Sequence, residues 1–426
     1  MFFRRTIGFA ALLSCSCRTT EAVPGEAITP DAGRLRSDIA WLADDRREGR
    51  ATGTAGNDSA AVWLARRHAA LGLRPLPGGD SYLQRFVARS AQMAHAGTPD
   101  GSATQNVLAL VPGRDPSLRG EYVVIGAHFD HLGRSPAGAL DPEARDVIRN
   151  GADDNASGTA ALLELARMFS ASPARRSIVI AHFSGEELGL LGSQWFVDHP
   201  PVSMDSVVAM VNFDMVGRLR NEKLIVYGVA TARELGGIVD SANTTPRLAV
   251  SAVGDGFGPS DHSSFYAKGI PVLHFFTDLH DDYHRASDDV ERIEADGEAR
   301  VVAMAERVVR AIADRPARLT PVRVAAPAPM AGGRTGSNVY LGSIPDMSAG
   351  DANGLRLSGV RAGSPADSAG LRAGDVIVQL GGRAVKDLYG YSDALYARTP
   401  GERVVIVYLR NGARSTTTVI LGKRGQ

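Results

Sequence analysis

Histidine and acidic residues gather at a few points along the chain, mostly next to predicted strand or helix ends. The residues concerned are His128, Asp130, Asp153, Asp154, Glu186, Glu187 and Asp214. Carboxylates that meet at neighbouring strand ends repel one another in a low-dielectric cleft unless a cation offsets their charge. The pattern predicts a metal site, and the alternative at this point is a set of solvated surface charges.

Both cysteines, Cys15 and Cys17, lie near the N-terminus, so the rest of the chain has no thiol for a metal or a disulfide. Zinc at hydrolytic centres accepts histidine and carboxylate ligands, and a shared aspartate can bridge two ions. Two ions about 3.5–4 Å apart can hold a hydroxide between them and polarise a carbonyl group together.

Strands and helices alternate around these residues. Strands are predicted at 106–111, 121–127, 177–183, 207–213, 224–227 and 271–276, and helices at 156–169, 188–197, 232–241 and 293–313. Amphipathic helices between Asp38 and Leu73, around a Gly-rich turn at 49–56, precede them. This alternation predicts an α/β fold, a mostly parallel central sheet with helices on both faces. Ligand sites in such sheets lie beyond the carboxyl ends of the strands.

Five short motifs make the prediction specific. They are residues 126–133 (GAHFDHLG), 150–158 (NGADDNASG), 184–193 (SGEELGLLGS), 212–215 (NFDM) and 282–284 (DYH). Together they resemble the M28 metallopeptidases, in the order of that family and over roughly Asp38 to Arg310. The resemblance implies a zinc-dependent exopeptidase fold with two Zn²⁺ ions, for which Co²⁺ or Mn²⁺ could substitute.

The same resemblance assigns metal ligands position by position. It implies that His128 and Asp214 bind one ion, that Glu187 and His284 bind the other, and that Asp153 bridges both. All five ligand positions are filled, which disfavours the related glutaminyl cyclases, because those enzymes use one zinc ion.

The resemblance also implies roles around the ligands. Glu186 would take a proton from the attacking water and give it to the leaving amine. Asp130, two residues after His128 on an extended segment, would face the same way and hold the imidazole. Nothing in the spacing of Glu186 and Glu187 tells which binds metal, so the resemblance alone assigns them. In this family the peptide after the bridging aspartate, here Asp153–Asp154, tends to be cis.

Further residues near the motifs carry weaker signals. Asp261 and His262, within 258–265 (GPSDHSSF), match another motif of the family, and we expect them to line the substrate cleft or support it rather than bind metal. His131 and His182 are interpreted as hydrogen-bonded packing residues. The stretch 53–56 lacks the lysine and the preceding strand of a phosphate loop and is interpreted as a turn.

The composition changes near residue 315. Residues 315–336, rich in Pro, Ala and Gly, are predicted to be a linker after a peptidase-like domain at 31–314. Within 337–426, the stretches 340–342, 360–366 and 369–377 resemble bacterial PDZ domains. The loop Tyr340, Leu341 and Gly342 would capture a C-terminal carboxylate of a peptide. The alternative is a module that packs on the peptidase and binds nothing.

The N-terminal residues 1–17 have the layout of a signal peptide, with Arg4 and Arg5 before an apolar run from Ile7 to Leu13. The end of this run resembles the lipobox of bacterial lipoproteins, which would make Cys15 a lipidated residue. We therefore expect an outer-membrane lipoprotein that faces the periplasm. A plain secretory signal, with a periplasmic or secreted protein, is the alternative.

The sequence as a whole thus predicts an exported zinc aminopeptidase that acts on peptides and carries a PDZ-like domain. Lys plus Arg equals Asp plus Glu at 47 each, so no net charge attracts nucleic acid or an anionic membrane surface. Two alternatives are another amide hydrolase or carboxypeptidase activity on the same fold, and an inactive envelope scaffold that binds peptides.

Overall fold

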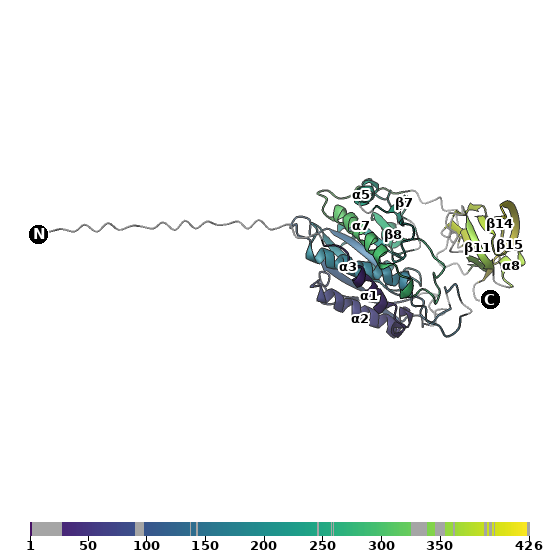
Figure 1. Ribbon diagram of the computed structural model, residues 1–426, viewed down its shortest axis with the longest axis horizontal. Helices are drawn as coiled ribbons and strands as arrows, with labels where there is room; N and C mark the ends of the chain where they lie inside the picture. The colour runs from purple at the N-terminus through teal and green to yellow at the C-terminus, as the bar shows by residue number, and fades with distance from the viewer. Residues whose placement is uncertain are drawn as a thin grey trace.

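The structure is a computed structural model, and it covers both predicted folded regions (Figure 1). It describes residues 1, 28–89, 98–136, 138–141, 144–244, 247–256, 258, 260–324, 339–345, 354–360, 363–386, 390–391, 394–395 and 397–423. The predicted signal peptide, Cys15 and most of the predicted linker lie outside these residues. Within them, no helix is both long and apolar enough to cross a membrane.

An eight-stranded sheet forms the centre of the first domain, in the order β1-β2-β4-β3-β5-β8-β6-β7. The four strands β4, β3, β5 and β8 run parallel, whereas β1, β2 and the β6–β7 pair meet their neighbours antiparallel at the two sides. The strands are β1 (Leu83–Val87), β2 (Ala103–Val111), β3 (Tyr122–His128), β4 (Ser177–Phe183), β5 (Val207–Phe213), β6 (Lys223–Tyr227), β7 (Ala249–Val253) and β8 (Val272–Phe276).

Helices cover both faces of this sheet, as predicted. The helices are α1 (Ala32–Leu42), α2 (Ala55–Ala70), α3 (Gly158–Ala171), α4 (Leu191–Asp198), α5 (Leu235–Ala242), α6 (His262–Ala267) and α7 (Ala295–Ala313). In β3, Val123 and Ile125 face the core with α1, α3 and α7, whereas Val124 faces the core with α4 and α6. Both faces of the central strands are therefore buried, which explains their continuous apolar sequences.

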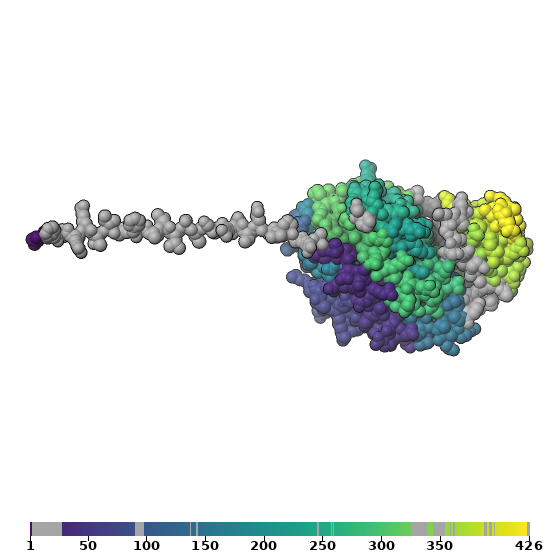
Figure 2. Space-filling model, viewed as in Figure 1, coloured from purple at the N-terminus to yellow at the C-terminus, as the bar shows by residue number. Residues whose placement is uncertain are grey.

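The N-terminal helices belong to the same body as the sheet. Figure 2 shows the residues that follow position 28, in purple, lying against green segments that come much later in the chain. A 3₁₀ turn, Asp45–Arg50, joins α1 to α2. Arg50 and Thr52, within the Gly-rich turn predicted at 49–56, donate hydrogen bonds to the Phe129 carbonyl and to the Asp130 carboxylate, in the loop that follows β3.

The predicted boundaries of the elements are mostly confirmed. Strands β4 and β5 have the predicted bounds, and helix α7 begins two residues later than predicted. The sequence missed β1, β7 and the short helix α6. Strand β7 lies at the edge of the sheet with no buried residue, so it lacks the apolar run that reveals a central strand.

The C-terminal residues form a separate small β-rich domain, in yellow-green in Figure 1, as predicted. Its elements are β9 (Val339–Tyr340), β10 (Ser343–Pro345), β11 (Leu355–Val360), α8 (Pro365–Ser368), β12 (Val376–Leu380), β13 (Arg383–Ala384), β14 (Arg403–Arg410), β15 (Ala413–Ile420) and β16 (Gly422–Lys423). Of the helix predicted at 392–397, residues 394 and 395 are described as helical.

The first part of the predicted linker is instead bound to the peptidase-like domain. Thr320 donates its backbone and hydroxyl hydrogens to Glu234, each over 2.9 Å, and Val322 N–H donates to the Thr231 carbonyl over 2.8 Å. The absence of periodicity at 315–324 therefore marks an extended segment on the surface of the domain rather than a free linker.

Candidate metal centre and active site

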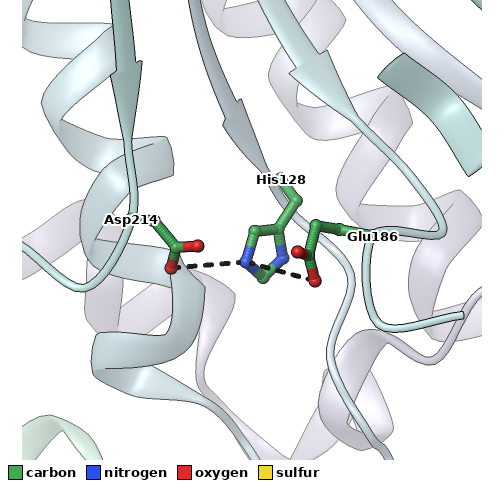
Figure 3. Close-up of side chains that lie close together, drawn as sticks. All are labelled: His128, Glu186 and Asp214. Atoms are coloured by element: carbon green, nitrogen blue, oxygen red, sulfur yellow. Dashed lines mark ion pairs between the residues drawn. The ribbon is translucent and has the colours of Figure 1, made fainter. Parts of the chain in front are cut away.

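Parallel strands bring the predicted site residues to one edge of the sheet. His128 ends β3, Glu186 lies three residues after β4, and Asp214 directly follows β5. Because β4, β3 and β5 are adjacent and parallel, their carboxyl ends meet, and Figure 3 shows the three side chains pointing toward one another. The sheet topology thus assembles residues that are far apart in the sequence.

The first group of candidate ligands consists of His128, Glu186 and Asp214. Nε2 of His128 lies 3.5 Å from Oδ1 of Asp214 and 4.0 Å from Oε2 of Glu186. Among the described residues, the buried Oδ1 atom of Asp214 has no hydrogen-bond partner. A buried carboxylate oxygen that faces an imidazole nitrogen fits a cation between them.

The second group consists of His131, Asp154 and Glu187, with His284 beside it. Nε2 of His284 lies 3.1 Å from Oδ2 of Asp154 and 3.2 Å from Oε2 of Glu187. His131, which we interpreted as a hydrogen-bonded packing residue, is buried and donates from Nδ1 to the other oxygen of Glu187 over 2.8 Å. The identity of its partner could not be predicted, because the partner is 56 residues away in the sequence.

The residue between the two groups is Asp154 and not Asp153, which corrects the predicted bridging ligand. Oδ1 of Asp154 lies 3.3 Å from Nε2 of His128, and its Oδ2 faces His284. Asp153 points away, because Oδ1 accepts a hydrogen bond from the Gly217 backbone over 2.8 Å. The cis peptide is likewise Asp154–Asn155, one residue later than predicted.

The reassigned Asp153 belongs to a supporting network behind the site. Its Oδ2 atom accepts from Nε2 of His280 over 3.1 Å, and Arg218 donates to the other ring nitrogen of His280 over 3.0 Å. The buried carboxylate of Asp288 accepts the backbone N–H groups of Asp153 and Asp154, each over 3.1 Å. These contacts fix the loop that carries Asp154, and the sequence prediction included neither His280 nor Asp288.

Each candidate histidine ligand is oriented by a backbone carbonyl group. Nδ1 of His128 donates to the carbonyl of Asp130 over 3.1 Å, and Nδ1 of His284 donates to that of Gly138 over 3.0 Å. A carbonyl oxygen only accepts, so both rings carry their proton on Nδ1 and present Nε2 to the site. That is the tautomer a metal ligand requires.

Asp130 supports His128, as predicted, but through its backbone carbonyl and not through its carboxylate. Its carboxylate lies 3.8 Å from Nδ1 of His128, outside hydrogen-bonding distance, and its backbone carbonyl makes the bond instead. The carboxylate accepts from the Thr52 hydroxyl over 2.9 Å and from the Glu186 N–H over 3.2 Å. The Asp130 carboxylate thus anchors the loop of Glu186 rather than the imidazole.

The two adjacent glutamates have opposite electrostatic surroundings. Burial raises the pKa of Glu186 well above its usual range, against the opposing charge of His128. Burial acts the same way on Glu187, but the charge of His284 together with hydrogen bonds from His131 and His284 outweighs it and lowers the pKa of Glu187 to about 2. A pair of carboxyls pushed apart in this way separates a proton-transfer group from a permanent anion.

An open pocket with an empty volume of about 470 Å³ adjoins both groups. Apolar side chains on its wall are Met215, Phe276 and Leu279, together with the ring of Tyr283. Ser260 also lines it and donates to Oδ2 of Asp214 over 2.7 Å.

Asp261 and His262 do not line this pocket, so of the two roles expected for them the lining of the cleft is wrong, and the supporting role agrees with their burial. Both are completely buried, and the ring of His262 stacks on that of His274 with centroids 4.4 Å apart. They lie at the start of α6, whose buried face turns them into the core. Their role is structural, and the neighbouring Ser260 takes the position in the cleft.

In the C-terminal domain, the predicted peptide-binding loop connects β9 to β10. The Leu341 side chain is buried, and its carbonyl accepts from the Ala366 N–H over 2.8 Å. Gly342 has a φ of +81°, and a Cβ atom there would lie 2.2 Å from the Cβ of Ser364. Glycine is therefore required at this position by conformation and by space, while binding of a peptide at the loop stays a prediction.

Comparisons with known proteins agree with both domains. The model of peptidase family M28 matches residues 106–309, and that of the PDZ domain matches residues 339–421. Aminopeptidase YwaD from Bacillus subtilis (strain 168) is 30% identical over 186 residues, which are 41% of this chain and 37% of that protein. Leucine aminopeptidase 1 from Trichophyton rubrum is 29% identical over 235 residues, or 50% of this chain and 57% of that protein. The chain thus spans between about a third and three fifths of these relatives.

Solved structures show the same fold. BSAP, a zinc aminopeptidase from Bacillus subtilis, superposes with a TM-score of 0.54 at 19% identity, covering 67% of this chain and 95% of that one. Glutaminyl cyclase from Porphyromonas gingivalis gives the same TM-score and identity, covering 66% and 98%. The fold therefore does not distinguish between these activities. On the family matches, the chain contains a peptidase family M28 domain followed by a C-terminal PDZ domain.

Proposed function

We propose that the chain is a zinc aminopeptidase that removes N-terminal residues from peptides at a centre of two metal ions. The observation that carries this proposal is the position of Asp154, which faces a histidine with each of its carboxylate oxygens. A single aspartate between two His-and-carboxylate groups is the ligand arrangement that a pair of zinc ions accepts.

The ligand sets combine the two groups with the family resemblance, which assigns Glu186 to proton transfer and His284 to metal binding. His128 and Asp214 would hold one ion, His284 and Glu187 the other, and Asp154 would contribute one oxygen to each. When bound, two zinc ions polarise the scissile carbonyl group and make water nucleophilic at neutral pH.

Glu186 is the group that moves protons. It lies 4.0 Å from Nε2 of His128 and lines the pocket, so it can reach both the attacking water and the departing nitrogen. Its raised pKa suits a group that takes a proton from water and then donates it to the leaving amine. Asp130 holds the backbone of Glu186 in place for both steps.

The pocket favours an apolar N-terminal residue. Met215, Phe276 and Leu279 offer an apolar wall beside the candidate ligands, which suits an apolar side chain. The α-ammonium group of a free N-terminus is cationic, so the neighbouring carboxylates attract it. A blocked N-terminus lacks this charge.

The experiment that tests the proposal joins metal content to substrate choice. Purified chain is analysed by mass spectrometry for metal and is offered unblocked and N-acetylated anilides of leucine, lysine and glutamate. We expect about two zinc ions per chain and release of aniline from the unblocked leucine substrate first. Bound zinc with equal cleavage of blocked substrates would indicate another amide hydrolase, and no metal with no turnover would favour the scaffold.

The PDZ domain is proposed to bind C-terminal segments of peptides or proteins and to present them to the peptidase. The support is the glycine at position 342, held in the left-handed conformation, and the edge strand β10 beside it. The hydrolysis-deficient E186Q chain can be tested for binding to a library of peptides with free or amidated C-termini. Binding that requires the free carboxylate supports this role, and no enrichment of either kind supports a purely packing module.

Export as a lipoprotein also stays a proposal, supported by the sequence around Cys15. Growth with a labelled fatty acid, followed by fractionation of membranes, compares the natural chain with a C15S variant. Label on the natural chain alone would support the anchor, whereas an unlabelled chain in the soluble fraction would favour a plain secretory signal.

A further inference from the structure

Arg50, in the turn between α1 and α2, is a fully buried arginine outside the candidate ligand groups. Among the described residues, no carboxylate forms an ion pair with it. Instead, its guanidinium group donates to four backbone carbonyls, those of Leu42, Phe129 and Asn150 over 2.7 Å and that of Gly151 over 3.0 Å. Buried arginines are ordinarily paired with an acid, so this arrangement requires an explanation.

The carbonyls that Arg50 contacts belong to the segments that carry the metal ligands. Phe129 follows His128 directly, and Gly151 lies three residues before Asp154. One planar guanidinium group therefore connects the loop after β3 to the loop that carries the shared aspartate. The fork of donors on arginine holds such partners in one geometry, which a flexible lysine does not.

The backbone around Arg50 is held in an unusual conformation. Glu48, Gly49 and Arg50 have consecutive φ values of +47°, +65° and +53°. A Cβ atom on Gly49 would lie 2.2 Å from the carbonyl oxygen of Arg149. Strained residues of this kind persist only where the surroundings hold them, and they gather at functional sites.

The positive charge of Arg50 has the opposite sign to the carboxylates of the site. Burial lowers its pKa to about 10, while the carboxylates of Asp130, Asp288, Asp154 and Glu187 oppose that shift. The guanidinium group therefore stays protonated at neutral pH. It does not line the pocket and lies among backbone carbonyls, with these four carboxylates close enough to affect its charge.

We propose that Arg50 is a positioning residue of the metal centre, which fixes the distance between His128 and Asp154 and supplies a permanent positive charge behind the carboxylates. This inference rests on the proposed two-metal function. It predicts that the loss of Arg50 weakens zinc binding beyond what a general loss of stability explains.

Arg176 offers a matched control. It is equally buried and also donates to backbone carbonyls, those of Ala313 and Arg315, but it precedes β4 at the opposite edge of the sheet and pairs with Glu121 over 2.7 Å. The variants R50A and R176A both remove a buried guanidinium group. Only the first is predicted to alter the metal centre.

The experiment measures zinc affinity of the metal-free full chain by competition with a chromogenic chelator, with Tm and circular dichroism recorded for each variant. We expect R50A to bind zinc about 10–100-fold more weakly than the natural chain, as for other residues that orient metal ligands. R176A should have a lowered Tm and an unchanged zinc affinity. If R50A does not fold, R50K and R176K replace the alanine pair, with a smaller expected loss of affinity for R50K alone.

The outcomes separate the two proposals. A natural chain that binds no zinc contradicts the proposed function itself. A natural chain that binds two ions, with the Arg50 and Arg176 variants alike in zinc affinity, overturns the role of Arg50 and leaves the proposed function intact.

Discussion

Oδ2 of Asp154 lies 3.1 Å from Nε2 of His284, although the two residues are 130 positions apart in the sequence. The other oxygen of Asp154 faces His128, so this aspartate occupies the centre of the site. Asp153, its neighbour, accepts from a backbone amide and from His280 instead. Two adjacent acidic residues thus have separate tasks, one in the centre and one in the support of its loop.

Substitution of each aspartate by asparagine should reveal this division. D154N removes the charge that two ions would share, and we expect it to retain fewer than two zinc ions per chain after dialysis against metal-free buffer. D153N keeps an oxygen for the Gly217 amide, so it should retain both ions with an affinity about 10–100-fold lower. The reverse result, with zinc lost from D153N and kept by D154N, would restore the bridging residue that the sequence predicts.

The adjacent glutamates provide a second paired test. E186Q removes the proton acceptor but keeps the side-chain shape, so we expect two bound zinc ions and a kcat about 10²–10⁴-fold lower. E187Q should instead lose zinc, because Glu187 faces His284 at 3.2 Å with an oxygen that stays ionised. Metal analysis and kinetics on the same samples show which glutamate binds zinc and which transfers the proton. Loss of zinc from E186Q with a fully loaded E187Q would exchange the two roles.

The central strands and most site residues could be predicted because apolar runs and acidic residues alternate along the chain. Strand β5 and Asp214 are an example, since a buried strand is followed at once by the carboxylate. The assignment within Asp153-Asp154 could not be predicted from pattern. It depends on which side chain the backbone turns inward, and the loop that decides this is held by Asp288, 134 residues away.

Other residues escaped prediction because their roles depend on tertiary contacts alone. Arg50 lies in a sequence that resembles an ordinary turn. Its partners are backbone carbonyls, and because every residue has one, the residue types do not reveal these contacts. His131 looks the same in sequence whether it packs or binds a carboxylate. For Asp261 the sequence left two roles open, and only the tertiary structure shows that this polar residue is buried behind the cleft rather than exposed to it.

Ser260 should tune the ion held by Asp214. Its hydroxyl donates to Oδ2 of Asp214 over 2.7 Å and accepts from the Asn212 amide over 2.8 Å, which leaves Oδ1 facing His128. We expect S260A to lower zinc affinity or activity by about 10–100-fold. The matched control is S263A, because the hydroxyl of Ser263 donates to the carbonyl of Gly258 and contacts none of the candidate metal ligands. If the two variants have the same zinc affinity in chelator competition, Ser260 does not tune the ion.

The pair of buried histidines His68 and His182 should make the protein sensitive to acid. Their Nε2 atoms lie 3.0 Å apart between α2 and β4. Burial, with a smaller contribution from Arg67, lowers the pKa of His68 to about 3, and burial together with His68 holds that of His182 well below its usual range. In the unfolded chain both would titrate near pH 6.5. Protons therefore bind to the unfolded state first, and the free energy of unfolding falls as the pH drops from about 6.5 toward 3.

Between pH 7.5 and 5.0 each such histidine should cost about 2 kcal/mol of the free energy of unfolding. Urea unfolding of the metal-free chain at both pH values measures this loss, because acid release of metal then plays no part. H68L should lose about 2 kcal/mol less than the natural chain over the same interval. H199L, which removes an exposed histidine, serves as the control and should follow the natural chain. If H68L and the natural chain lose the same free energy, the pair is protonated in the folded protein and does not confer acid sensitivity.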